Sequence, residues 1–160
     1  MSAVHEIPVS VRKYLNEKEG MYEVVPHARD YSAQQTAADT HTPGVRFAKC
    51  LAMVIDGVHA MVMLPADHRL DWVSLRKSLG GKEARMVKEE EMKALFPDCE
   101  VGAEPPLGKL FGMPVYVSKV LAAQPLITFN GGTHEEAMRM SFVEFERLTE
   151  PVVIECSVKV

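Results

Sequence analysis

The strongest constraint on the fold is a β-hairpin signal in the first half of the chain. Residues 47–55 are β-prone and largely apolar, Asp56 and Gly57 follow, and residues 58–64 are again apolar. Asp-Gly is favoured in two-residue hairpin turns, because both central residues adopt a positive φ there. We therefore expect two antiparallel strands, and the remaining residues have to build a core around them.

Shorter signals on both sides of the hairpin alternate between helix and strand. Ser32 with Gln35, and Ser141 with Glu144, have the spacing of capping boxes, which mark the starts of helices. Residues 134–140 fit a helix or a strand equally well. The expected helices are 8 to about 20, 32 to about 42, 71–79, 89–95 and 141–148, and the expected further strands are 22–25, 84–87, 110–117, 126–130 and 152–158.

These elements favour an α/β fold of the α+β kind. Strands and short helices interleave without the long, regular βαβ spacing of a doubly wound sheet. We expect a mixed, curled, barrel-like sheet surrounded by short helices. No linker or repeat divides the 160 residues, so residues 1–160 are expected to form a single domain.

Composition and charge exclude several classes of protein. The net charge of −4 argues against nonspecific coating of nucleic acid, and we expect no DNA partner. A cluster of cations follows residue 75 and is either a local RNA-binding patch or a solvated surface; it consists of Arg76, Lys77, Lys82, Arg85 and Lys88. No apolar stretch can span a bilayer and no export signal opens the chain, so a cytoplasmic protein without a membrane partner is expected.

The potential metal ligands are scattered along the sequence. Cys50, Cys99 and Cys156 lie about fifty residues apart, and the six histidines form no H-x-x-x-H pair. An odd number of unpaired cysteines is typical of reduced thiols rather than of disulfides. We expect no metal site and no other cofactor.

The first segment that a plain core does not explain is residues 41–51, a turn that leads into a strand carrying Lys49. Alternation along the strand places Lys49 beside Phe47, Leu51 and Met53. Lysine is rarely buried without a partner, so it either serves a site or extends along a partly open face to solvent.

Two glycine-containing loops are the other unusual segments. Residues 101–108 place glycines around a Pro-Pro pair, and residues 129–134 read F-N-G-G-T-H. Such loops can bring backbone N–H and C=O groups close to a ligand, or they can be ordinary connections.

Together, and in this order, these segments resemble the YbaK/ProX-type editing domain, which occurs free-standing or inserted in bacterial prolyl-tRNA synthetases. The matching runs are H-x-P-G-x-R-x-A-K ending at Lys49, G-x-x-x-P from Gly102 to Pro106, F-N-G-G-T-H, and the tail at 140–148. The resemblance covers residues 25 to about 153.

The resemblance implies hydrolysis of the ester that joins a small amino acid to the terminal ribose of tRNA. The expected partners are the aminoacyl-tRNA acceptor end and an aminoacyl-tRNA synthetase. The ester is already activated, so positioning and electrostatic stabilisation suffice without a metal or a catalytic triad. The catalytic residues it implies are Lys49 and Gly102, and the substrate-binding residues are Pro106, Gly131, Gly132, Thr133, His134 and Cys50.

Cys50 leaves the edited amino acid open. Alanine-specific members place asparagine after the lysine, whereas this chain has cysteine, so serine, cysteine and other small amino acids remain candidates. Because side chains alternate along a strand, we expect Cys50 to face away from Lys49 and to act on the substrate only indirectly, unless a bulge redirects it.

Two other functions remain open at this point. A catalytically degenerate member would bind an aminoacyl end or a protein without turning it over. A thiol hydrolase would use Cys50 or Cys99 as its nucleophile, with His41 or His134 as the base.

Overall fold

The Asp56-Gly57 hairpin forms as predicted. In the computed structural model, which describes residues 6–160, β2 (Ala48–Ile55) pairs antiparallel with β3 (Val58–Pro65) from the turn to the end of both strands. Asp56 and Gly57 have φ of 51° and 81°, the conformation of a type I′ turn. This hairpin is the centre of the larger sheet.

Residues 6–160 form a mixed five-stranded sheet in the order β5-β2-β3-β6-β9. β5 pairs antiparallel with β2, whereas β3, β6 and β9 run parallel to one another. A second, antiparallel sheet has the order β1-β8-β7, and β4 pairs with β10. The strand bounds are β1 Glu23–Pro26, β4 His68–Leu70, β5 Ala84–Met86, β6 Val115–Ser118, β7 Leu126–Asn130, β8 Glu136–Ser141, β9 Val152–Ile154 and β10 Ser157–Lys159.

The mixed α/β fold is therefore confirmed, but the sheet is not a closed barrel. The two larger sheets meet at one parallel bridge, between Phe47, which immediately precedes β2, and Thr128 in β7. Within residues 6–160, β9 and β5 remain the edges of the five-stranded sheet. The sheet curls without closing on itself.

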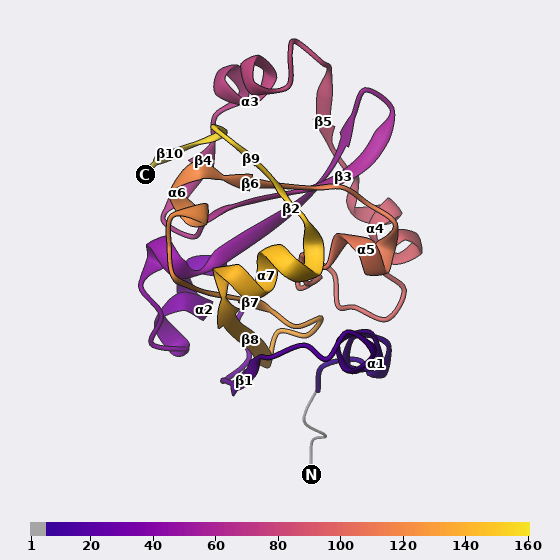
Figure 1. The fold of residues 1–160 in the computed structure, drawn as a ribbon, viewed down its shortest axis with the longest axis vertical. Coiled ribbons are helices and arrows are strands. Elements are labelled where there is room, and N and C mark those ends of the chain that lie inside the picture. The colour runs from indigo at the N-terminus through magenta and orange to yellow at the C-terminus, as the bar shows by residue number, and fades with distance from the viewer. Residues whose placement is uncertain (1–5) are drawn as a thin grey trace.

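Short helices surround the sheets (Figure 1). α3 lies at the end of the molecule beyond β5, α4 and α5 lie together beside the five-stranded sheet, and α1 lies at the opposite end near β1. The Oγ atoms of Ser32 and Ser141 accept the predicted capping hydrogen bonds at the starts of α2 and α7. The helices are α1 Val9–Glu17, α2 Ala33–Asp39, α3 Trp72–Ser78, α4 Glu89–Leu95, α5 Gly108–Phe111, α6 Lys119–Ala122 and α7 Phe142–Thr149, and a 3₁₀ turn spans Gly44–Arg46.

Two predicted strands were wrong in part. Residues 110–117 are not one strand, because Gly112 takes a left-handed conformation (φ 70°) and ends α5 before β6 begins. Residues 152–158 are not one strand either, because the chain leaves its pairing with β6 after Ile154 and then pairs with β4. The ambiguous stretch at 134–140 is strand β8, and β4 and α6 were not predicted at all.

The two faces of β2 pack against different clusters of apolar side chains. Ala48, Cys50 and Ala52 face the larger cluster, which includes residues of α1, α4, α7 and the second sheet. Leu51 and Met53 face a smaller cluster, in which Leu75 of α3 takes part. This alternation decides which side chains of β2 can share a site.

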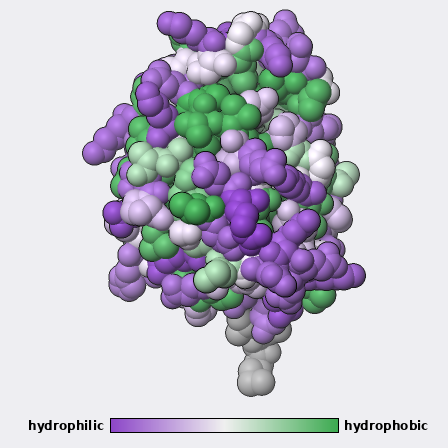
Figure 2. Space-filling view, viewed as in Figure 1, coloured by the Kyte–Doolittle hydropathy of each residue, from purple (hydrophilic) through white to green (hydrophobic). Residues whose placement is uncertain are grey.

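Some apolar side chains stay exposed on the surface. Val152 and Val153 on the edge strand β9 are about half exposed. Figure 2 shows hydrophobic surface above the centre of this view, where Figure 1 has β6 and β9, and mainly hydrophilic surface at the lower right. Within residues 6–160, each helix is too short or too polar to cross a bilayer.

The turn residues give a direct test of the hairpin. Gly57→Ala should lower the free energy of unfolding by about 1 kcal/mol, because alanine is strained at φ 81° while no atom lies within 4 Å of the added carbon. Asp56→Asn is the matched control and should be nearly neutral, since asparagine tolerates positive φ. Urea unfolding measures both, and equal stability of Gly57→Ala and the wild type would contradict the turn geometry.

Candidate active site

The loop after α4 is fixed to the turn between β7 and β8 by backbone hydrogen bonds. The Glu100 N–H donates to the Gly132 carbonyl at 2.9 Å, and the Gly132 N–H donates to the Ala103 carbonyl at 2.8 Å. Two glycine-rich segments that lie about thirty residues apart in the sequence therefore form one hydrogen-bonded unit.

The Glu100 carboxylate holds the same two segments together through side chains. Oε1 accepts from the Thr133 hydroxyl at 2.7 Å and from the His134 N–H at 2.9 Å, while Oε2 accepts from Arg29. Burial alone would raise the pKa of Glu100, but the hydrogen bonds from Arg29, His134 and Thr133 together lower it to about 2. Glu100 is therefore ionised at all physiological pH values.

The His134 ring packs against the backbone of Gly102. A side-chain carbon at Gly102, whose φ is 85°, would lie 3.8 Å from Cε1 of His134. The His134 ring donates from Nε2 to the Val101 carbonyl at 2.9 Å, and its centroid lies 5.2 Å from that of Tyr31. Because a carbonyl only accepts, Nε2 carries the proton, and the ring supports the loop that carries Gly102.

Gly131 and Gly132 are required for packing. A side-chain carbon at Gly131 would lie 2.8 Å from Ile7, and one at Gly132 would lie 2.7 Å from Pro8. Both glycines therefore let the segment before α1 pack against the turn. Pro106 is buried as well, and none of these three predicted substrate-binding residues lines the pocket described next.

A pocket of about 250 Å³ lies between β2, the segment from β5 to α4, and the Gly102 loop. Its wall is mainly apolar. A carboxyl group from the loop reaches it, and helix α4 closes one side. The lining residues include Cys50, Ala52, Val87, Met92, Gly102 and Glu104. The structure thus brings Cys50 and Gly102 together at one pocket, and Cys50 lies on the opposite face of β2 from Lys49, as alternation predicts.

Glu104 is the buried charge of this pocket. Its side chain is 4% exposed, and its Oε2 atom has no hydrogen-bond partner within residues 6–160. Burial raises the pKa of Glu104 to about 7, against the opposing effect of the N–H groups of Glu104 itself and of Gly102. The carboxyl group therefore titrates near neutral pH.

Lys49 lies on the other face of β2. Its Nζ donates to the His68 carbonyl in β4 at 2.6 Å, and burial lowers its pKa while Asp67 opposes that shift. Lys49 is not among the lining residues of the pocket, whereas its neighbour Cys50 is. The strand thus separates the two residues that the resemblance placed in one site.

The sequence profile of the aminoacyl-tRNA editing domain matches residues 26–148. The chain belongs to the aminoacyl-tRNA editing domain family. This match confirms the resemblance to YbaK/ProX-type domains, and all four matching runs lie within it. No curated protein sequence matches the chain significantly.

Solved structures share the fold of this editing domain. A candidate trans-editing enzyme for prolyl-tRNA synthetase superposes with a TM-score of 0.81 at 23% identity, over 96% of this chain and 99% of that one. The hypothetical protein APE2540 gives 0.81 at 21% identity, over 93% and 99%. A candidate signal transduction protein from Marinobacter aquaeolei VT8 gives 0.75 at 18% identity, over 96% of this chain but 31% of the other. At these identities the likeness shows the fold.

The thiols of the editing domain are poorly suited to act as nucleophiles. Burial, reinforced by Glu104, raises the pKa of Cys50 well above its ordinary value, and burial, Glu104 and Asp98 raise that of Cys99 to about 12. A thiolate is the reactive form of cysteine. Both groups stay protonated at neutral pH, which disfavours the thiol-hydrolase alternative.

One group of side chains within residues 6–160 has the composition of a metal site. Ligand atoms of His27, Asp30 and Asp39 lie within 4.8 Å of one another. The Nδ1 atom of His27, however, lies 2.8 Å from the Ala28 carbonyl and 3.1 Å from Oδ2 of Asp30. Nδ1 therefore donates a hydrogen bond to the Ala28 carbonyl, whereas Nε2 has no hydrogen-bond partner among residues 6–160.

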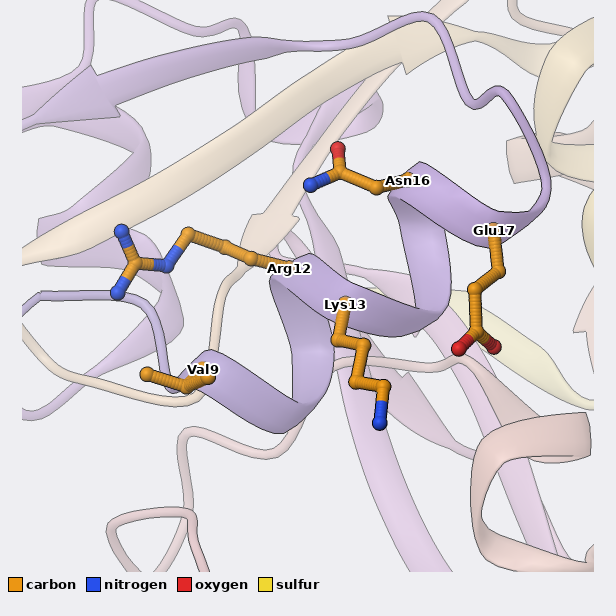
Figure 3. A pocket seen from close by; sticks show the side chains of 5 residues that line it. All are labelled: Val9, Arg12, Lys13, Asn16 and Glu17. Atoms are coloured by element: carbon orange, nitrogen blue, oxygen red, sulfur yellow. The ribbon is translucent and has the colours of Figure 1, made fainter.

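A shallower hollow of about 630 Å³ lies on helix α1, away from the Gly102 pocket. Figure 3 shows its five lining side chains, Val9, Arg12, Lys13, Asn16 and Glu17, and all come from helix α1. A hollow lined by one helix offers no converging groups from a second element. The smaller Gly102 pocket, where three segments meet, is the better candidate for chemistry.

Sequence reasoning missed Arg29, Glu100 and Glu104. A signal existed only for Glu104, the one charged residue inside the Gly-Pro loop, and it was not used. Glu100 and Arg29 lie 71 residues apart, and their pairing becomes visible only in the folded chain.

The raised pKa of Glu104 predicts a pH-dependent stability. Its pKa is 4.5 in the unfolded chain and about 7 in the folded one, so the folded protein binds more protons between these values. The free energy of unfolding should fall by about 3 kcal/mol as pH rises through this window. Glu104→Gln should remove that loss, measured by urea unfolding near pH 5 and pH 8. A constant difference between variant and wild type across this range would contradict the buried charge.

Proposed function

We propose that this protein edits mischarged tRNA by hydrolysing the ester between a small amino acid and the terminal ribose. The observation that carries the proposal is the pocket of about 250 Å³ between β2 and the Gly102 loop. Two of the three segments that line it, β2 and the Gly102 loop, carry or adjoin family motifs. The family itself is one of aminoacyl-tRNA editing.

The size and lining of the pocket suit a small aminoacyl group. Sites for drug-sized ligands usually occupy about 300–1,000 Å³, so this one is small. Ala52, Val87 and Met92 offer apolar contacts to a short side chain, and Gly102 lines the pocket without a side chain of its own. The ribose and the rest of the tRNA would remain outside.

In the proposed reaction, a water oxygen bonds to the carbonyl carbon of the ester and the bond from that carbon to the ribose oxygen breaks. The water supplies one proton to the ribose oxygen, and the products are a free amino acid and an uncharged tRNA end. The N–H groups of Gly102 and Glu104 point at the Glu104 carboxyl group, and that of Ala103 donates to the Glu100 carbonyl. We therefore assign the loop a positioning role.

Lys49 would act from the opposite face of β2. Its single hydrogen bond within residues 6–160, to the His68 carbonyl, leaves two of the three ammonium N–H groups for other acceptors. We propose that they bind a ribose or phosphate oxygen of the acceptor end. Arg85 and Lys88 flank pocket residues Met86 and Val87, are exposed, and are suited to further phosphate contacts.

A deacylation assay with tRNAs charged with different amino acids tests the proposal. Alanyl-, seryl- and cysteinyl-tRNA differ by about one heavy atom, so we expect more than one to be hydrolysed, whereas phenylalanyl- and tyrosyl-tRNA should react about 100-fold more slowly. A chelator present throughout should leave the rates unchanged.

Aromatic substrates that react as fast as the best small one would overturn the small-pocket account. Hydrolysis of none, together with binding of an aminoacylated RNA end, would favour the degenerate binding module. A loss on chelation that added zinc restores would reveal a metal site.

Lys49→Met tests the predicted role of the lysine. Methionine keeps the apolar stem, so one hydrogen bond worth about 1 kcal/mol is lost and the fold should persist. We expect kcat/KM for deacylation to fall on the order of 100-fold, with a melting temperature within a few degrees of the wild type. Lys13→Met, at an exposed site of α1 away from the pocket, is the control and should change neither. Wild-type rates in folded Lys49→Met would contradict the role.

A further inference from the structure

We propose that Glu104 binds the α-ammonium group of the aminoacyl ester. This role rests on the proposed function and names the residue that would recognise a free amino group on the substrate.

Glu104 presents an unpaired carboxylate oxygen to an apolar pocket. Its side chain is 4% exposed, and Oε2 has no hydrogen-bond partner within residues 6–160. A buried carboxylate without a cation or a full set of donors is costly, and proteins rarely keep one. The other oxygen is served by the N–H groups of Gly102 and Glu104, so the missing partner is on the pocket side.

The surrounding protein supplies no cation. Within the described chain, no lysine or arginine lines the pocket, and the second acidic residue, Glu89, lies exposed at its edge. The titratable groups that face Glu104 are the thiols of Cys50 and Cys99, and both stay neutral because burial and Glu104 raise their pKa. The local potential is therefore negative and favours a positively charged ligand.

An aminoacyl ester carries one cation, the α-ammonium group, next to the carbonyl carbon that water attacks. With the ammonium group at Oε2, Gly102 of the same pocket is available to the carbonyl group, and the apolar lining of Ala52 and Met92 is available to the side chain. One contact would thus orient the reacting carbon and select esters with a free amine. It also explains why a carboxyl group with a pKa near neutral is kept here, since ligand binding supplies the missing charge.

The competing role for Glu104 is to take a proton from the attacking water. The two roles differ in one respect. A proton acceptor serves every ester in the pocket equally, whereas an ammonium-binding carboxylate favours only esters with an amine. Alanyl-tRNA and its deaminated counterpart, lactyl-tRNA, have the same size and differ in that one group.

The first experiment compares both substrates with the wild type and with Glu104→Gln. Glutamine keeps the size of the side chain and one acceptor oxygen. We expect Glu104→Gln to lose at least tenfold in kcat/KM on alanyl-tRNA and less than threefold on lactyl-tRNA, after correction for uncatalysed hydrolysis. Equal losses on both substrates, or no loss on either, would overturn the inference. Glu90→Gln is the control: it removes a carboxylate of α4 that does not line the pocket, and it should behave as the wild type.

The second experiment does not depend on hydrolysis. L-alaninamide and L-lactamide are titrated into the protein at pH 7, and binding is followed by NMR shifts of Glu104 and Gly102. We expect alaninamide to bind the wild type at least tenfold more tightly than lactamide and this preference to vanish in Glu104→Gln. Equal binding of both amides would overturn the inference even if tRNA is deacylated. A preference for alaninamide without any deacylation would support the ammonium site and refute the proposed function.

Discussion

The Glu100 carboxylate is the interaction on which the geometry of the site depends. It accepts hydrogen bonds from Thr133, from the His134 N–H and from Arg29, and so joins three segments that are far apart in sequence. Two backbone hydrogen bonds, from the Glu100 N–H to the Gly132 carbonyl and from the Gly132 N–H to the Ala103 carbonyl, join the same two segments. Both contacts act on the same loop, so they position Gly102 and Glu104 beside β2 at the pocket.

Successive side chains of β2 point to opposite faces of the sheet, so the pocket and Lys49 lie on different sides of the strand. Cys50 and Ala52 form the floor of the pocket, while Lys49 reaches the carbonyl of His68 on the far side. A strand can serve a substrate with both faces only at its end, and Lys49 lies next to the first residue of β2. We propose that the acceptor end of tRNA passes this end of the strand, with the amino acid on one side and the ribose and phosphates on the other.

The hairpin, the capped helices and the mixed sheet could be predicted because each has a local signature. Asp56-Gly57 fixes a turn, and Ser32 and Ser141 mark helix starts. The family could be predicted from short motifs in a fixed order. The pocket could not be predicted from the sequence. Its main feature is the buried, unpaired carboxylate of Glu104, and that burial results from the packing of the loop in the folded chain. Gly131 and Gly132 show the same limit: their packing against Ile7 and Pro8, which lie far away in the sequence, becomes visible only in the folded chain.

The central claim is that the pocket between β2 and the Gly102 loop receives the aminoacyl group. A crystal structure with 3′-alanylamino-3′-deoxyadenosine, an amide that cannot be hydrolysed as an ester, tests it most directly. The account predicts the alanyl side chain near Ala52 and Met92, the ammonium within hydrogen-bond distance of Glu104, and the adenosine outside the pocket. An alanyl group bound beside Lys49 and His68, with the Gly102 pocket empty, would contradict the claim.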